Sequence, residues 1–321
     1  MITAFLVVDK PPGLTSHDIV AAVRACTGIA KVGHTGTLDP FATGVLPLAL
    51  GGSTRLIQFL DESIKVYDAT IRLGIATDTG DPTGKVIREL PVPDVDETAV
   101  RAVLASFVGK RMQKPPDYSA VKVEGRPLYS YARKGEVPEV AARPVTIHAM
   151  DFVSLSLPYL RVTITCSRGT YARVLADEIG VALGTAGHLD ALVRPRSGPF
   201  LLDDALTMAE LGALVSGEPG RAWEDVLLSR GRGERIPWRP REEVMEGLRP
   251  WVKSAVSCLP GLPIVDVSAV DVRRIRAGGP PPLAPAGVAP AGRYLVLCGD
   301  EVIAVAERDA RGPRVVKVME Q

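Results

Sequence analysis

The chain has 321 residues, of which 46% are hydrophobic and 23% charged, as expected for a globular protein of one large domain or two unequal ones. Its formal net charge is +1, so a nucleic-acid partner would need a local basic surface. The four cysteines stand far apart without a CxxC pair, which predicts buried thiols in a reducing compartment rather than disulfides or a zinc site. No apolar run approaches the ~18 residues of a membrane span, so we expect a soluble, cytoplasmic protein.

The first part of the chain alternates between strand and helix patterns. Residues 2–8 predict a strand rather than a signal peptide, and a helix follows that Ser16 caps and Gly28 ends. Residues 53–63 predict a short helix. Residues 65–74 alternate as a strand does, with one apolar face made of Tyr67, Ala69, Ile71 and Leu73.

Further along, residues 96–109 and 170–184 predict amphipathic helices, and residues 159–166 predict another strand. Strands and helices interleave without regular βαβ spacing, which predicts a mixed α+β fold with a mainly antiparallel sheet and flanking helices, not a doubly wound one. From residue 217 to 261 the patterns weaken, apart from one helical stretch, and we interpret this segment as a linker or insertion. Three short strands with tight turns end the chain.

The stretch GHTGTLDPFATGVL, from Gly33 to Leu46, surrounds the carboxylate of Asp39 with glycines and threonines. Pro40 biases the backbone of Asp39 away from helix. An ordinary Asp-Pro turn, in which the carboxylate accepts a backbone N–H, would explain the dipeptide alone. The three threonines and the apolar run that follows favour a long loop held against a core, which is typical of a functional site.

Other chemistries lack their residues in this sequence. The stretch has no Gly-Lys-Ser/Thr ending of a phosphate-binding loop, the chain has no GxSxG motif, and its four histidines lack a metal-binding spacing. Paired carboxylates for glycoside hydrolysis cannot be placed from spacing. A lone nucleophilic carboxylate remains as the candidate chemistry.

Five stretches resemble, in the same order, the TruB family of tRNA pseudouridine synthases: DKPPGLTSHD, GHTGTLDPFATGVL, KVYDATIRLG, PPDYSAVKVEGRPLYSYARKG and CSRGTYARVLADEIG. The end of the chain resembles the PUA domain of such enzymes more weakly. The resemblance implies a catalytic domain at 1–216 with an RNA-contacting lid at about 112–145, the linker or insertion at 217–261, and a small β-barrel-like PUA domain at 262–321.

The resemblance also implies a reaction. A uridine in the tRNA T loop, at position 55, is detached from its ribose at N1, turned, and reattached through C5. This chemistry needs no cofactor and no metal, but the base must first be flipped out of the folded loop. The expected partner is tRNA, through its T arm and its acceptor end, and we expect a monomer without membrane contact.

In the family, the catalytic aspartate matches Asp39 and the arginine of the GTYxR motif matches Arg173. A carboxylate that must stay ionised in a pocket needs a nearby cation, because burial alone raises its pKa. The spacing of Arg173 equally allows a surface pair with Asp177, four residues on along the helix. Sequence does not decide whether Asp39 attacks C6 of the uracil or C1′ of the ribose.

Tyr67 matches the active-site tyrosine of the family, whose ring can stack on a flipped base. Core packing beside its apolar neighbours is the alternative. Tyr171 is expected to pack under the Asp39 loop or to contact RNA. Leu192 matches an apolar pocket position with Arg194 beside it, although Val193 departs here from the usual Leu-Arg-Arg.

His34 matches the histidine that holds the T loop open in the family, and a loop histidine bonding the backbone is the alternative. Lys10 is expected to contact a phosphate or to support the Asp39 loop, unless it is simply a solvated turn lysine. In the lid, phosphate-neutralising cations alternate with aromatic rings that can stack on bases: Lys122, Arg126, Arg133, Lys134, Tyr118, Tyr129 and Tyr131. A solvated hairpin of mixed charge is the alternative there.

Arg273, Arg274 and Arg276 form a cluster near the C-terminal strands, where they track an RNA backbone or are merely solvated. Because the matching catalytic residues all precede residue 198, removal of the C-terminal domain is expected to leave chemistry on an isolated T-arm hairpin intact. Three other functions remain open. They are a guide-RNA-dependent rRNA pseudouridine synthase, an RNA chaperone that binds tRNA without chemistry, and a glycosidase of free nucleosides, which the basic lid disfavours.

Overall fold

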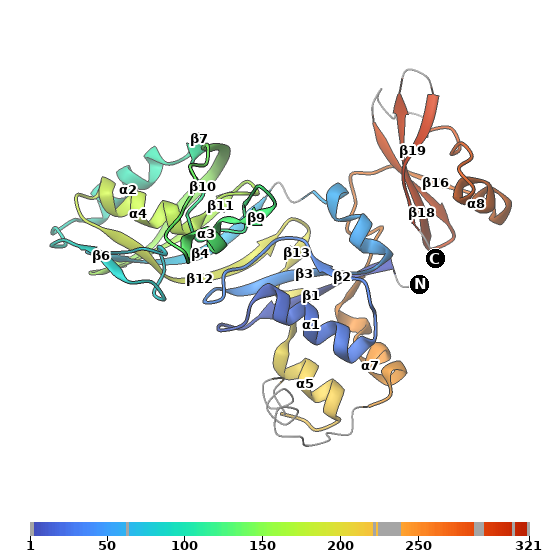
Figure 1. Ribbon diagram of the computed structural model, residues 1–321, viewed down its shortest axis with the longest axis horizontal. Helices are drawn as coiled ribbons and strands as arrows, with labels where there is room; N and C mark the ends of the chain where they lie inside the picture. The colour runs from blue at the N-terminus through green and yellow to red at the C-terminus, as the bar shows by residue number, and fades with distance from the viewer. Residues whose placement is uncertain are drawn as a thin grey trace. The chain divides into compact units, whose positions relative to one another are not determined.

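The computed structural model describes residues 3–61, 64–220, 223, 239–285, 292–309 and 312–319. By its internal contacts the chain divides into two compact units. Unit 1 comprises residues 1–39, 45–61 and 199–321, and unit 2 comprises residues 40–44 and 62–198. Mainly antiparallel strands flanked by helices make up the chain, so the predicted mixed α+β fold is confirmed (Figure 1).

Unit 1 contains the N-terminal elements and everything after residue 198. Its elements are β1 (Thr3–Lys10), α1 (Ser16–Thr27), β2 (Val32–His34), β3 (Thr43–Gly51, entered from unit 2), η1 (Gly52–Arg55), η2 (Ile57–Phe59), β13 (Phe200–Leu201), η3 (Leu202–Asp204), β14 (Leu206–Thr207), α5 (Met208–Ser216), α7 (Arg241–Gly247), η4 (Arg249–Trp251), β15 (Val252–Ser254), β16 (Ile264–Asp266), α8 (Ala269–Arg276), β17 (Arg293–Cys298), β18 (Glu301–Asp309) and β19 (Gly312–Val318). Strand β1 lies beside β3 and pairs with β14 in parallel and with β15 antiparallel. The short helix expected at 53–63 is instead two 3-10 turns, the usual form for runs this short.

Helix α1 begins one residue earlier than predicted. Its N-cap is Thr15, whose hydroxyl accepts the backbone N–H of Asp18 while the Asp18 carboxylate accepts that of Thr15. This reciprocal capping box also lowers the pKa of Asp18, chiefly through the hydrogen bonds from Thr15. The side chain of Ser16 therefore does not cap the helix. The predicted end at Gly28, in the left-handed conformation, is confirmed.

Part of the segment from 217 to 261, which the sequence suggested as a linker or insertion, is regular structure. Helix α7 contacts α1 and α5, and β15 pairs with β1 through Ala4, Phe5 and Leu6. The segment thus adds a strand to the sheet of unit 1. Residues 221–222 and 224–238 lie outside the described part of the chain.

At the C-terminus, the three predicted strands β17, β18 and β19 form an antiparallel sheet. Two further elements were not predicted: β16, which pairs with β17 in parallel, and α8. Helix α8 carries a local signal, because Ser268 and Asp271 form a capping box like that of α1.

One hydrophobic core joins the C-terminal strands to the N-terminal ones within unit 1. It is made of Phe5, Val7, Val45, Ala49, Leu56, Leu60 and Phe200 together with Ala255, Cys258, Leu259, Leu295, Leu297, Val302, Val305 and Met319. The guanidinium of Arg293 also lies 5.3 Å from the centroid of the Phe59 ring. The C-terminal strands therefore support β1 and β3, which flank the Asp39 loop in the sequence.

This shared core changes what truncation should do. Deletion of residues 262–321 would expose the apolar side chains of β1 and β3, each of which contributes about 1.5–3 kcal/mol when buried. We expect the truncated protein to be insoluble or to unfold well below the full chain, rather than to retain chemistry as the sequence suggested. Solubility and thermal unfolding by circular dichroism test this. An unchanged unfolding temperature would contradict a shared core.

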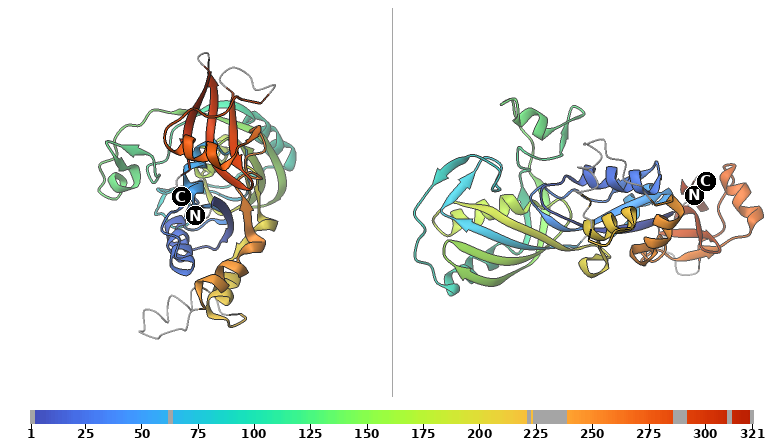
Figure 2. Two further views of the ribbon diagram at one scale, coloured as in Figure 1. Left: turned by 90° about the vertical axis from the view of Figure 1, so that its right-hand side faces the viewer. Right: turned by 90° about the horizontal axis from the view of Figure 1, so that it is seen from below.

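Unit 2 is a sheet in the order β12-β4-β11-β10-β7 with three helices and two small hairpins. Its elements are β4 (Lys65–Leu73), β5 (Ile75–Thr77), β6 (Val86–Glu89), α2 (Glu97–Ser106), β7 (Gly109–Gln113), β8 (Lys122–Val123), β9 (Arg126–Pro127), α3 (Leu128–Ala132), β10 (Arg143–Ser156), β11 (Tyr159–Cys166), α4 (Ala172–Ala182) and β12 (Gly187–Ser197). The predicted alternation of β4 and β11 and the predicted helices α2 and α4 are confirmed. Hairpin β8–β9 and α3, the central part of the lid, project from the rest of unit 2 (Figure 2).

The four cysteines are all free thiols. Cys26, Cys166 and Cys258 are buried as predicted, and burial raises the pKa of the Cys26 thiol to about 12. Cys298 is an exception because it is only partly buried. Within the described ranges, no helix is long and apolar enough to cross a membrane.

Candidate active site

The loop that carries Asp39 is anchored in unit 1 by a serine of α1. The buried Ser16 hydroxyl accepts the N–H of Leu38 at 3.0 Å and donates to the carbonyl of Leu38 at 3.2 Å. Leu38 is only 3% exposed, so the residue before Asp39 is fixed by both its backbone and its side chain. The N–H of Thr35 donates to the Pro47 carbonyl at 3.1 Å and ties the start of the loop to β3. The loop is therefore held against a core, as the sequence predicted.

His34 and Lys10 also belong to unit 1. His34 ends β2, where it pairs with Leu48 of β3, and its ring lies edge-on to that of His17 with centroids 5.4 Å apart. Lys10 ends β1 with none of its surface exposed, and its ammonium donates to the Pro11 carbonyl at 2.8 Å. Lys10 is thus not a solvated turn lysine. Its contact with a phosphate or its support of the Asp39 loop stays a prediction.

The residues after Asp39 continue in unit 2, where Gly44 lies against Arg194. The two pair in parallel, and a Cβ on Gly44, whose φ is 101°, would lie 2.5 Å from the Arg194 carbonyl oxygen. Only glycine permits this approach. Arg194 itself has none of its surface exposed. Thr43 and Gly44, at the end of this stretch, are therefore closely packed beside Val193 and Arg194.

Tyr67 and Leu192 share the buried face of the unit 2 sheet. Tyr67 is 8% exposed, and its neighbour two positions on, Ala69, pairs with Leu192 on β12. Leu192 is 6% exposed. The core-packing interpretation of Tyr67 is compatible with this position, and stacking of its ring on a base stays a prediction.

Arg173 lies in the first turn of α4 and is 4% exposed. Its Nη1 donates to the Thr79 carbonyl at 2.7 Å, its Nη2 donates to the Tyr118 carbonyl at 2.8 Å, and Nη1 lies 3.8 Å from Oδ2 of Asp81. Gly80 makes room for the side chain, because a Cβ there would lie 3.2 Å from the Arg173 Cβ. The orientation of the guanidinium is therefore fixed by contacts within unit 2.

The surface-pair alternative for Arg173 does not fit these contacts. Asp177 bonds Arg88 at 2.7 Å instead, and both side chains are over 40% exposed. Arg173 is buried, so the two residues of the suggested pair lie in different environments. The cost of burying a guanidinium is offset by its charge-assisted bonds to carbonyl groups.

The turn after β5, from Asp78 to Gly84, supplies contacts to Arg173 that were not predicted from the sequence. Asp81 is 6% exposed and accepts hydrogen bonds from the hydroxyls of Thr79 and Thr83 and from the N–H of Thr83. A signal was present in the sequence. Asp81 stands among threonines and glycines directly before a proline, as Asp39 does in its own loop.

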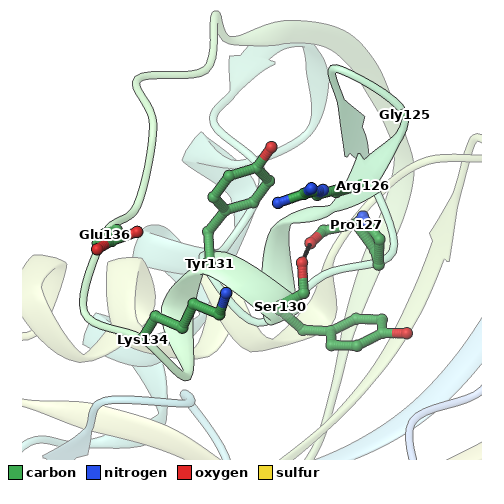
Figure 3. A pocket seen from close by; sticks show the side chains of 8 residues that line it. Gly125, Arg126, Pro127, Ser130, Tyr131, Lys134 and Glu136 are labelled. Carbon is green, nitrogen blue, oxygen red and sulfur yellow. Dashed lines mark hydrogen bonds between the residues drawn. The ribbon is translucent and has the colours of Figure 1, made fainter.

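The lid carries a pocket of about 530 Å³. Arg126 and Tyr131 point toward one another across it, and the ammonium of Lys134 points into the same space (Figure 3). The Tyr131 hydroxyl donates to the Val123 carbonyl at 3.2 Å, which fixes the ring. The guanidinium of Arg133 lies 5.5 Å from the centroid of Tyr129. Three cations and two aromatic rings thus lie on one short segment, a combination that is typical of RNA-binding surfaces.

Comparisons with known proteins agree on one family. The profile described as "TruB family pseudouridylate synthase (N terminal domain)" matches residues 24–172. The tRNA pseudouridine synthase B of Geotalea uraniireducens is 50% identical over 224 residues, which cover 70% of this chain and 71% of that protein. The same-named protein of Geobacter sulfurreducens is 49% identical over 225 residues, covering 70% and 73%.

Solved structures show a similar fold. A chain of a Cbf5-Nop10-Gar1 complex matches with a TM-score of 0.67 and 25% identity, covering 99% of this chain and 85% of that one. A chain of an archaeal box H/ACA sRNP Nop10-Cbf5 complex matches with a TM-score of 0.66 at 23% identity, covering 99% and 86%.

Proposed function

This chain belongs to the TruB family of pseudouridylate synthases, and we propose that it isomerises uridine 55 in the T loop of tRNA to pseudouridine. The family profile spans both Asp39 and Tyr67, and relatives about 50% identical are tRNA pseudouridine synthases B. The observation that carries the proposal is the Asp39 loop itself, a lone carboxylate on a segment fixed by the buried Ser16. A nucleophile must be held in place before the substrate arrives.

In the proposed reaction, the N1–C1′ bond breaks and a C5–C1′ bond forms, while C5 loses a proton and N1 gains one. Asp39 supplies the nucleophile, at C6 of the uracil or at C1′ of the ribose. Tyr67 stacks on the flipped base, and Leu192 contributes apolar contact. Arg173 acts as the cation that keeps the carboxylate ionised, as the family motifs imply.

The experiment that tests this function uses purified protein alone and an unmodified tRNA transcript. Pseudouridine is mapped by carbodiimide treatment and reverse transcription. A stop at the T-loop uridine is expected, and because no guide RNA or second protein is present, it would also count against the guide-dependent alternative. Absence of product at that uridine would refute the proposal.

We also propose that β16–β19 with α8 form a PUA-like domain that contacts the acceptor end of tRNA, and that the lid contacts the T arm. Arg274 and Arg276 are partly neutralised by Asp271 and Glu301. Arg273 and Arg274 are exposed on α8 and are the candidates for phosphate contact. A cytoplasmic location fits the four free thiols, and the expected monomer stays a prediction for light scattering.

Two double variants separate these contacts. Arg126→Ser with Lys134→Ser in the lid is expected to weaken binding to a T-arm hairpin and to whole tRNA alike. It should also make the slope of log Kd against log salt shallower by about 2, one unit for each lost phosphate contact.

Arg273→Ser with Arg274→Ser on α8 is expected to weaken binding to whole tRNA only, with the hairpin affinity unchanged. Fluorescence anisotropy across a salt series measures the Kd of each double variant for each of the two RNAs. Equal weakening of both RNAs by the α8 variant would contradict the acceptor-end contact. An unchanged slope for the lid variant would mean that its cations are merely solvated.

A further inference from the structure

Gln113, the last residue of β7, holds the backbone at the start of α4. Its side chain is 2% exposed, its Oε1 accepts the N–H of Tyr171 at 2.8 Å, and its Nε2 donates to the Tyr171 carbonyl at 3.1 Å. Tyr171 is the N-cap residue of α4. Backbone N–H groups at helix starts need partners from outside the helix, and here a distant amide supplies one.

The segment after Gln113 returns to the same helix. The carbonyl of Tyr118 accepts from the Arg173 guanidinium, so residues 113–118 bond the start of α4 at two places. The rest of the lid follows directly, and there the N–H of Tyr129 donates to the Ser119 carbonyl at 3.1 Å. The first residues of the lid, 113–118, thus pack across the first turn of α4, which carries Arg173.

We propose that Gln113 is a positioning residue for Arg173. Its amide fixes the Tyr171 peptide two residues before the arginine, so that the guanidinium reaches the carbonyls of Thr79 and Tyr118 together. The inference rests on the proposed function, in which Arg173 acts at the uridine. Displacement of a catalytic group by about 1 Å can cost roughly a hundredfold in rate, and a buried pair of hydrogen bonds prevents such displacement.

The test compares two variants of β7. Gln113→Leu keeps the approximate size but removes both hydrogen bonds, and we expect its single-turnover rate to fall at least about tenfold while the Kd for tRNA stays within about threefold. The matched control is Arg111→Met. Arg111 joins the same strand to the same helix through Glu178, at 2.9 Å, but farther from Arg173. Arg111→Met should have a lower free energy of unfolding than the wild type but the same single-turnover rate.

A conservative variant sharpens the result. Gln113→Glu keeps an acceptor for the Tyr171 N–H but places a carboxylate oxygen against the Tyr171 carbonyl, so its rate should fall below that of the wild type. Equal rate losses in Gln113→Leu and Arg111→Met would show that β7 acts only by packing on α4, and would overturn the proposal. A wild-type rate in Gln113→Leu would overturn it as well.

Hydrogen exchange at the Tyr171 amide, followed by NMR, separates this inference from the proposed function. Exchange should be faster in Gln113→Leu and unchanged in Arg111→Met. If the wild type forms no pseudouridine, the proposed function fails, yet the exchange rates still decide whether Gln113 fixes the start of α4. Equal exchange in the wild type and Gln113→Leu would refute the positioning role.

Discussion

Asp39→Asn is expected to abolish pseudouridine formation while the Kd for tRNA stays within about tenfold, or ~1.4 kcal/mol. The amide has the size of the carboxylate but neither its charge nor its nucleophilicity. The loop should keep its shape, because the Ser16 hydroxyl bonds the backbone of Leu38 and not the Asp39 side chain. Carbodiimide mapping of the T loop and filter binding measure the two quantities.

Ser16→Ala is the matched control for this loop. It removes two buried hydrogen bonds to Leu38 without touching the carboxylate, at a cost of about 1–3 kcal/mol. We expect a lower thermal unfolding temperature and a reduced but measurable rate. Substantial turnover by Asp39→Asn would reject Asp39 as the nucleophile, whatever the control shows.

Arg173→Ala should lower the single-turnover rate by about 10²–10³-fold, the usual cost of removing one charge-stabilising donor. Asp177→Ala should leave the rate near that of the wild type, because Asp177 bonds the exposed Arg88. If Arg173 is the counter-ion of Asp39, its loss raises the pKa of that carboxylate. The ionised form then predominates only at higher pH, and the acid limb of the rate profile moves upward.

Arg173→Lys distinguishes charge from geometry. Lysine keeps the positive charge but replaces the planar guanidinium, whose separate nitrogens reach the carbonyls of Thr79 and Tyr118, with a single ammonium. We expect a rate between those of the wild type and Arg173→Ala. Equal, mild effects of Arg173→Ala and Asp177→Ala would instead show that Arg173 has no special role in catalysis.

Local patterns in the sequence were enough to locate β1, α1, β4 and α4, four of the elements that carry the candidate site. The alternation of residues 65–74 predicted the buried face of β4, and Gly28 predicted the end of α1. The crowding of glycines and threonines around Asp39 predicted a loop held against a core. These features depend on neighbours within a few residues, where backbone sterics and side-chain period act directly.

Tertiary structure alone decided which distant groups meet. The carbonyls that hold Arg173 come from residues 94 and 55 positions away, and Gln113 reaches Tyr171 across 58 positions. The burial of Lys10 and the core that joins the C-terminal strands to β1 and β3 are likewise long-range. No local period or capping signal encodes such contacts, because they arise when strand pairing brings separate segments together, and only then do buried polar groups find their partners.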